Sequence, residues 1–328
     1  MRMLAAGLAL LLGFQAARAG EDAAEADLRL KLEPGQQLRY AWEIHVTNDS
    51  KGSEAGKPLE LRVDKDLKLN VRLQGLPPTP KGPVAASLKF EEFELQEKRK
   101  IGKAEESLLK VDRRRIYFEE NGKVRIDSLS DIGLEKITDY QRNLRGIEQH
   151  DVHLAFDRTG RQAHVAGEKE LVETLSGTTS QGLFPLLAGE ATSPGGAWDG
   201  QFELPVLSEV KLERPARVNT KMKFAGWVNR DGRKLALLDV LSFWDGEDLA
   251  GADSKGLQVV ISGVDGMGAG SCYFDPALGA YEEGNMTFQI RYKLEGRREG
   301  ERTSLDVHGK TRFKFTRVQA AAEGPRPE

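Results

Sequence analysis

The sequence predicts a mainly β fold, with long antiparallel strands in a two-part sandwich or half-barrel architecture and one or two short helices. Three observations predict it. Apolar and polar residues alternate with a period of two over long stretches, which is typical of strands with one buried and one solvated face. Turn sequences separate several of these stretches. Helical spacing of apolar residues is rare in the 328 residues.

The clearest predicted strand runs from Leu59 to Leu73. Its odd positions are apolar except for Lys65, and its even positions are all polar. This pattern predicts a long antiparallel strand with one face in water. The same alternation is found in residues 38–46, 286–294 and 305–315. Residues 235–244 are largely apolar at both parities, which predicts a central strand covered on both faces.

Three turn sequences predict hairpins. Asn121-Gly122 and Asp231-Gly232 supply the positive φ angles that tight hairpin turns need, and each lies between two short apolar runs. The polar segment 295–301 contains two glycines and joins two of the alternating runs. Those two runs are therefore predicted to pair with each other.

Helices are predicted in two places. Ile137, Tyr140 and Leu144 lie near helical spacing behind Ser130-Asp131, which is a plausible cap for a helix over about 132–146. Residues 168–175 predict a shorter second helix.

The chain is predicted to have two β-rich parts. Residues 185–200 are rich in Gly and Pro and predict a linker between an N-terminal part (20–184) and a C-terminal antiparallel part (201–319). Residues 320–328 lack periodicity and predict a disordered tail.

Residues 1–19 have the features of a signal peptide. Arg2 precedes an apolar run, and Ala17-Arg18-Ala19 has the small-x-small form of a cleavage site. Gly20 follows rather than the cysteine of a lipoprotein. The sequence therefore predicts an exported, soluble protein, periplasmic or extracellular, with no integral membrane segment in the mature chain.

Charge and cysteine content exclude some classes. Residues 20–328 carry 46 basic and 51 acidic side chains, a balance that argues against a general nucleic-acid binder. Cys272 is the one cysteine, so no intramolecular disulfide can form. It shares a strand face with Phe274, which predicts a small buried residue rather than a nucleophile, because no activating base is evident.

Residues 150–153 (His-Asp-Val-His) form the one local cluster with metal-ligand character. On a strand, Asp151 and His153 share a face while His150 lies on the other, so three ligands do not converge. The other histidines are scattered, at positions 45, 164 and 308. No metal site is predicted.

Other motifs also favour structural interpretations. The glycine-rich run 266–270 lacks the Gly-Lys-Ser/Thr of a nucleotide loop, and strands follow it, which favours a flexible turn. The basic runs 98–100 and 113–115 lie among glutamates, as on mixed solvated strand faces. Nothing singles out a glycosidase pair among the 51 acidic residues. No catalytic, cofactor-binding or metal residue is predicted, and no cofactor.

A weak internal similarity links Phe156-Asp157-Arg158-Thr159-Gly160 with the turn Phe274 to Gly279. In both, an aromatic ends a strand, an Asp opens the turn and a Gly closes it; duplication and two independent turns are both open explanations. Together with Gly195-Gly196-Ala197-Trp198 and Leu204-Pro205, these turns resemble a group of exported bacterial β-rich proteins of unknown function. The resemblance extends from about Leu28 to Val318. It implies a β-rich fold and brings no activity and no functional residues.

Three function classes follow. The first is a non-catalytic exported protein with a binding or structural role in the envelope or outside the cell, with an envelope protein as partner. The second is a carrier of lipid or another apolar ligand in a β half-barrel. The third is a hydrolase with dispersed catalytic residues. A binding surface would be an exposed apolar patch, to be sought first at Trp198, Trp227 and Trp244, for which core packing is the default.

Overall fold

The fold is described by a computed structural model for residues 24–102, 105–138, 141–142, 149, 151–167, 184–204, 210–214, 216–244, 248–253, 257–298 and 301–318. Within these ranges the regular structure is antiparallel β with one 3₁₀ turn and two α-helical residues, 141–142, which confirms the predicted mainly β class. The strands are β1 (Ala26–Asp27), β2 (Gln37–Glu54), β3 (Lys57–Leu76), β4 (Val84–Ile101), β5 (Glu105–Asp112), β6 (Ile116–Glu120), β7 (Lys123–Asp127), β8 (Asp151–Phe156), β9 (Gln162–Ala166), β10 (Ala191–Thr192), β11 (Ala197–Leu204), β12 (Val210–Leu212), β13 (Ala216–Arg230), β14 (Arg233–Trp244), β15 (Leu249–Asp253), β16 (Gln258–Asp275), β17 (Ala280–Arg298) and β18 (Glu301–Val318), and the 3₁₀ turn η1 is Leu134–Lys136.

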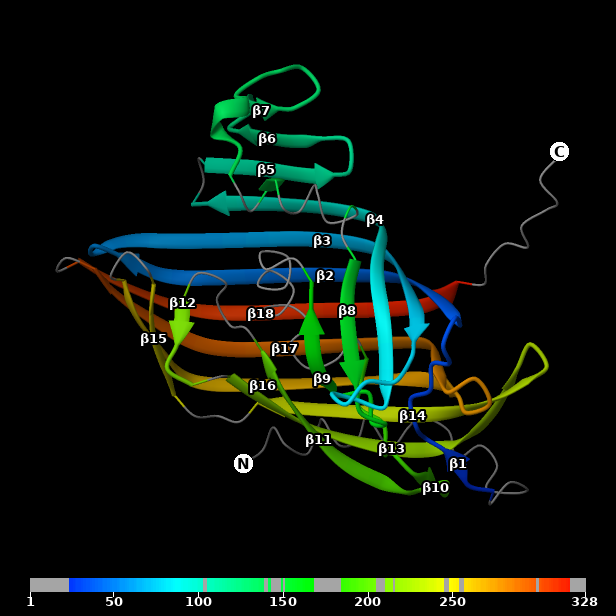
Figure 1. Ribbon diagram of the computed structural model, residues 1–328. Coiled ribbons are helices and arrows are strands. Elements are labelled where there is room, and N and C mark those ends of the chain that lie inside the picture. Colours follow the sequence, from blue (N-terminus) through cyan, green and yellow to red (C-terminus); the bar gives the residue numbers. More distant parts are fainter. Residues whose placement is uncertain are drawn as a thin grey trace, which may run out of the picture.

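The described strands form one large sheet and one small pair (Figure 1). The 16-stranded sheet has the order β11-β13-β14-β16-β17-β18-β2-β3-β4-β5-β6-β7, with β15 and β12 attached at β16 and β8 and β9 attached at β4. β18 pairs with β2 along most of its length. The two parts that the sequence analysis separates at residues 185–200 therefore share one sheet.

Strand β4 belongs to two layers. Its first half, up to Lys89, pairs with β8, and its second half, from Glu94, pairs with β5. Between the halves, Glu91 is an extra residue opposite the step from Asn70 to Val71 on β3. Such a bulge bends a strand. As Figure 1 shows, β8 and β9 therefore cross over the sheet, whereas β5, β6 and β7 extend beyond it.

The register arranges side chains in rows that cross the sheet. One row, on the face here called the inner face, contains Met222, Val240, Gly270, Met286, Phe313, Ile44, Leu67, Leu95, Val111 and Ile116. The neighbouring row on the outer face contains Lys221, Leu241, Ala269, Thr287, Arg312, His45, Asp66, Gln96, Lys110 and Tyr117. The alternation seen in the sequence thus separates a buried face from a largely polar one.

The core is filled where β8 and β9 cover the sheet, at the region here called the closed end. Tyr40, Trp42, Phe184, Tyr281 and Phe315 form an aromatic cluster there, with the Phe184 and Tyr281 rings stacked at 5.3 Å. The Tyr40 hydroxyl donates to the Tyr281 carbonyl at 2.9 Å. The cavity beside this cluster is only about 20 Å³, room for about one water molecule.

The two turns with similar sequences hold the N-terminal segment. In each turn, the Asp side chain accepts backbone hydrogen bonds and the closing Gly has a positive φ. The backbone N–H of Leu30 donates to a carbonyl of the first turn at 2.8 Å, and that of Lys31 donates to a carbonyl of the second at 2.8 Å. Both turns thus clamp the chain directly after β1.

All three predicted hairpins are present. Asn121 and Gly122 have φ angles of 50° and 73°, and Asp231 and Gly232 have 51° and 73°, as a tight turn with two positive φ angles requires. The runs on either side of residues 295–301 pair as β17 and β18.

The predicted helix over 132–146 does not begin where expected. Ile132 forms an isolated bridge with Asp127, η1 is a single 3₁₀ turn, and Ile137 is extended with φ −65° and ψ 119°. Thr138 and Gln141 instead exchange side-chain to backbone hydrogen bonds, the reciprocal arrangement that opens a helix. Most of the remainder of this segment lies outside the described residues, as do the predicted helix at 168–175, the predicted signal peptide 1–19 and the tail 320–328.

Candidate ligand-binding site

A cavity lies against the inner face of the part of the sheet that extends beyond the closed end. This part, here called the flap, comprises β5, β6, β7 and η1 (residues 105–138). The cavity has a volume of about 520 Å³, within the range of roughly 300–1,000 Å³ that is usual for ligand pockets. It is lined by Glu97, Arg99, Ser107, Leu109, Phe118, Glu120, Arg125, Ile126, Lys136, Thr138 and Gln141.

The floor of the cavity is apolar. Leu109, Phe118 and Ile126 are directly opposite one another on β5, β6 and β7, so their side chains project from the same face. They continue the apolar rows of the inner face, but Leu109 and Phe118 are only half-buried. Ile126 belongs to the buried core and Leu109 and Phe118 pack against it, and all three also line the cavity.

An ion-pair cluster borders the floor on the β4 side. Glu97 lies directly opposite both Leu109 and Lys65, and its side chain is only 11% exposed. Its carboxylate accepts a hydrogen bond from Arg99 and lies 4.0 Å from the Lys65 ammonium. A buried carboxylate requires such partners. Lys65, the exception in the predicted strand 59–73, therefore has a structural counterpart on the next strand.

The opposite border is also charged. The Arg125 guanidinium pairs with the Glu120 carboxylate at 2.9 Å. Lys136, the last residue of η1, also lines the cavity, and its ammonium forms no ion pair within the described ranges. The cavity thus combines an apolar floor with charges at two borders.

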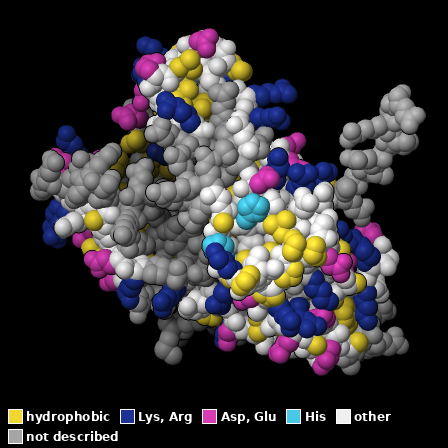
Figure 2. Space-filling view, viewed as in Figure 1, with side chains coloured by type: hydrophobic (Ala, Val, Ile, Leu, Met, Phe, Trp, Pro, Cys, Tyr) yellow, Lys and Arg dark blue, Asp and Glu magenta, His cyan; other side chains and the backbone are white. Residues whose placement is uncertain are grey.

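The loop between β7 and η1 is held in place by Asp127. Arg115 donates to both of its carboxylate oxygens, at 2.9 and 2.8 Å, and Leu129 and Ser130 donate to the same carboxylate. The Arg115 hydrogen bonds hold the pKa of Asp127 at about 2, against a smaller opposing effect of burial. In Figure 2 the flap projects from the rest of the molecule, with apolar side chains exposed among charged ones.

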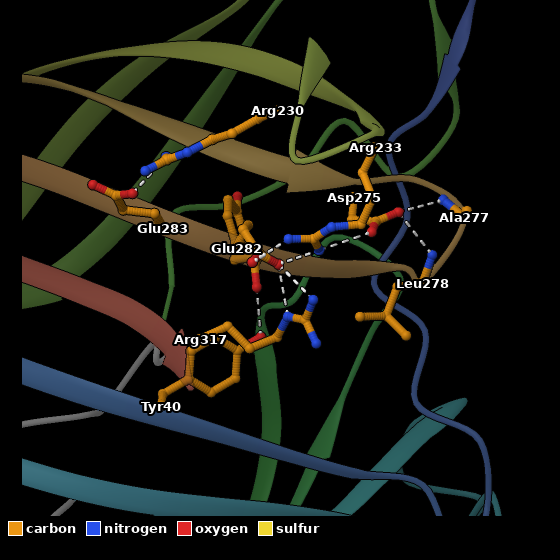
Figure 3. Close-up of polar contacts among 10 residues, drawn as sticks. Tyr40, Arg230, Arg233, Asp275, Ala277, Leu278, Glu282, Glu283 and Arg317 are labelled. Carbon is orange, nitrogen blue, oxygen red and sulfur yellow. Dashed lines mark hydrogen bonds and ion pairs between the residues drawn. The ribbon is translucent and has the colours of Figure 1, made fainter. Parts of the chain in front are cut away.

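A second polar cluster lies at the closed end (Figure 3). Glu282 accepts hydrogen bonds from Arg233 at 2.8 and 2.7 Å and from Arg317 at 2.7 Å. Burial raises the pKa of Glu282, but the two guanidinium groups outweigh it, so that the pKa is below its usual range. The Asp275 carboxylate, beside Arg233, accepts hydrogen bonds from the backbone N–H groups of Ala277 and Leu278. These groups satisfy one another, which indicates a structural role.

Residues 150–153, for which the sequence predicts no convergent metal ligands, are described from Asp151 to His153. Asp151 and His153 are exposed on the same face of β8, with Val152 buried between them. His150 lies outside the described residues. Among the residues that the structure describes, no group of three or more His, Cys, Asp and Glu side chains is arranged to hold a metal ion.

Cys272 is part of the core, and the glycine run is part of a strand. Cys272 is fully buried, and burial raises the pKa of its thiol. The run 266–270 is not a turn, because it lies within β16. A Cβ on Gly268 would lie 2.3 Å from the ring of Phe288, so glycine is required there for that ring to cover the strand.

A chain of hydrogen bonds on the outer face has the connectivity of a hydrolase triad. The Asp66 carboxylate lies 2.6 Å from Nδ1 of His45, and Nε2 of His45 lies 3.2 Å from the Thr47 hydroxyl. These residues lie within the β2–β3 ladder, where backbone N–H groups pair with the neighbouring strand and do not form an oxyanion hole. His45 and Asp66 are about half exposed, at 44% and 52% of their side chains. This chain is therefore a surface cross-strand cluster.

The three tryptophans do not form an exposed patch. The Trp198 indole donates to the Leu186 carbonyl at 3.0 Å, and that of Trp227 donates to the Ala24 carbonyl at 2.9 Å. Trp244 packs against a small second core. The prediction that β14 is covered on both faces is wrong for its outer face, where Phe243 lies opposite Met267, which is 60% exposed.

Comparisons with known proteins identify no family. No family model matches the chain, and no curated protein matches it. Among solved structures, a structure on lipid–protein interactions in lipovitellin is similar over 90% of this chain and 27% of that one, with 12% identity and a TM-score of 0.43. The chain thus spans about a quarter of that protein. The β domain of the Bordetella autotransporter BrkA matches with 10% identity over 85% of this chain and 99% of that one, with a TM-score of 0.24. At these TM-scores the matches carry no functional argument.

The described part of the chain contains no helix that is both long enough and apolar enough to cross a membrane.

Proposed function

We propose that this protein is a non-catalytic, exported bacterial protein that binds a small molecule with an apolar part in the flap cavity. The observation that carries the proposal is the cavity of about 520 Å³ with an apolar floor. A ligand that covers this apolar surface removes it from water, and this lowers the free energy of the complex. The assignment to the exported β-rich group that the sequence resembles is part of the proposal.

The distribution of packing supports this function over a purely structural one. The closed end has a cavity for about one water molecule, whereas the flap keeps a space more than twenty times larger. Apolar side chains that line so large a space stay in contact with water until a ligand covers them, and this favours a binding role. Cys272 is buried, and the His45–Asp66–Thr47 chain lies on the open outer face.

The test is binding of N-phenyl-1-naphthylamine, a neutral apolar probe whose fluorescence rises in apolar surroundings. We expect saturable binding that Leu109→Gln weakens at least about tenfold, because it places an amide in the apolar floor. Leu108→Gln is the matched control, since Leu108 is the preceding residue on β5 and lies on the opposite face.

Circular dichroism establishes that both variants are folded. Binding that is absent in the wild type, or that Leu108→Gln and Leu109→Gln weaken equally, would contradict a site in the flap cavity.

A further inference from the structure

The charges around the flap cavity are unbalanced. Among the residues that the structure describes, its lining contains three basic side chains, Arg99, Arg125 and Lys136, and two acidic ones, Glu97 and Glu120. The whole chain has the opposite sign, with a net charge of −3. A positive excess in a partly enclosed site of an acidic protein is a feature that attracts anions.

The two carboxylates are already neutralised. Glu97 is bound by Arg99 and faces Lys65, and Glu120 is bound by Arg125. Lys136 is the lining cation for which the described residues provide no ion pair. A ligand group near it would therefore meet an ammonium that is not shared with a carboxylate.

We propose that the ligand of the flap cavity is an amphiphile with a single anionic head group, a carboxylate or a phosphate. This inference rests on the proposed function and names its ligand class. The apolar part of the ligand lies on Leu109, Phe118 and Ile126, and the head group binds the ammonium of Lys136. The Arg125 guanidinium on the same border stays paired with Glu120.

The arrangement disfavours other head groups for physical reasons. A cationic head group would be repelled by Lys136, and would have to compete for carboxylates that arginines already occupy. A neutral head group would leave the apolar contact intact but would gain nothing from the charge. The selectivity therefore depends on charge, and the apolar floor supplies the remaining affinity.

The test compares dodecyl amphiphiles of equal chain length by isothermal titration calorimetry, below their critical micelle concentrations. Dodecanoate and dodecyl phosphate are the anionic ligands, dodecyl maltoside is neutral and dodecyltrimethylammonium is cationic. We expect the anionic ligands to bind at least about fivefold more tightly than the neutral one, with a preference that weakens as salt is raised. The comparison of dodecanoate with dodecyl phosphate distinguishes carboxylate from phosphate as the preferred head group.

Lys136→Gln should abolish the preference for anionic ligands, because it removes the ammonium that binds the head group. Lys123→Gln is the matched control, because Lys123 is an exposed flap lysine that does not line the cavity. Equal affinity of wild type for anionic and neutral ligands, or a preference that survives in Lys136→Gln, would overturn the inference while the proposed function stands. If no amphiphile binds and the neutral probe also fails, both fall.

Discussion

Replacing Glu282 by Gln is expected to destabilise the protein more than the same change at the next residue. Glu282 accepts three hydrogen bonds from two arginines, and its side chain is 12% exposed. Glu283 forms an ion pair with Arg230 in which the side chains are 25% and 45% exposed. Figure 3 shows both groups on the same strand, so Glu283→Gln is a control at a neighbouring site.

The magnitude follows from burial. Hydrogen bonds to charged groups are worth roughly 1.5–3 kcal/mol, and Gln keeps the size of Glu but loses the charge and one acceptor oxygen. We expect Glu282→Gln to lower the free energy of unfolding by about 2–3 kcal/mol, since Arg233 and Arg317 keep some access to water. An exposed pair contributes up to about 1 kcal/mol, so Glu283→Gln should cost less than that.

The assay is urea unfolding at pH 7 followed by circular dichroism, together with its pH dependence. A carboxyl whose pKa is lowered in the folded state contributes stability above its unfolded pKa, and this contribution is lost as pH falls through the folded pKa. The difference between wild type and Glu282→Gln should therefore be full at pH 7 and decrease below about pH 4. Equal costs for the two variants at pH 7, or a difference that grows on acidification, would refute the reasoning.

Two further predictions concern the N-terminal clamp and the flap. Gly279→Ala should destabilise the protein more than Gly232→Ala, and should expose residues 24–32 to limited proteolysis. Both glycines have a positive φ, so both substitutions strain the backbone. At position 279, however, the added Cβ would also lie 2.3 Å from the Lys31 side chain, whereas nothing lies within 4 Å at position 232. Equal loss of stability would contradict a clamp. Asp127→Asn should speed amide hydrogen exchange at residues 128–134 at neutral pH, and the difference from wild type should vanish as pH falls towards the Asp127 pKa of about 2. Unchanged exchange would show that another contact fixes this loop.

The strands with unbroken alternation could be predicted from the sequence because, in each of them, either the odd-numbered or the even-numbered residues face the core along the whole strand. Strand β3 is the clearest case. Strand β4 was not predicted, and the reason is the bulge at Glu91. Before the bulge, even residues such as Leu88 face the core, and after it odd residues such as Leu95 do, so the alternation changes parity within the strand.

The predicted helix at 132–146 begins later than expected for a different reason: residues 141–142 are helical, whereas 132–137 are not α-helical. Its apolar spacing was real, but Asp127 fixes the preceding loop through Arg115, and this tertiary contact places Ile132 in a bridge. Thr138 and Gln141, three residues apart in the sequence, form the pair of hydrogen bonds that opens a helix. The segment 185–200 has the composition of a linker, yet the side chains of Leu186 and Leu187 are buried. Composition alone does not reveal that a glycine-rich segment crosses a core.

The cavity could not be predicted directly, but its border left a signal. On the inner face of β2, the apolar residues extend to Val46, and the next residue on that face is Asn48. On β3 they extend to Leu67 and are followed by Lys65, and on β4 they extend to Leu95 and are followed by Glu97. Lys65 and Glu97 share one row of the register, and Asn48 lies in the next row. A polar residue on a buried face thus marks the border of the cavity, provided that the register is known. Lys65 can be recognised in the sequence as a polar residue on an otherwise apolar strand face. Its partner Glu97 is recognised only when the pairing of β3 with β4 is known.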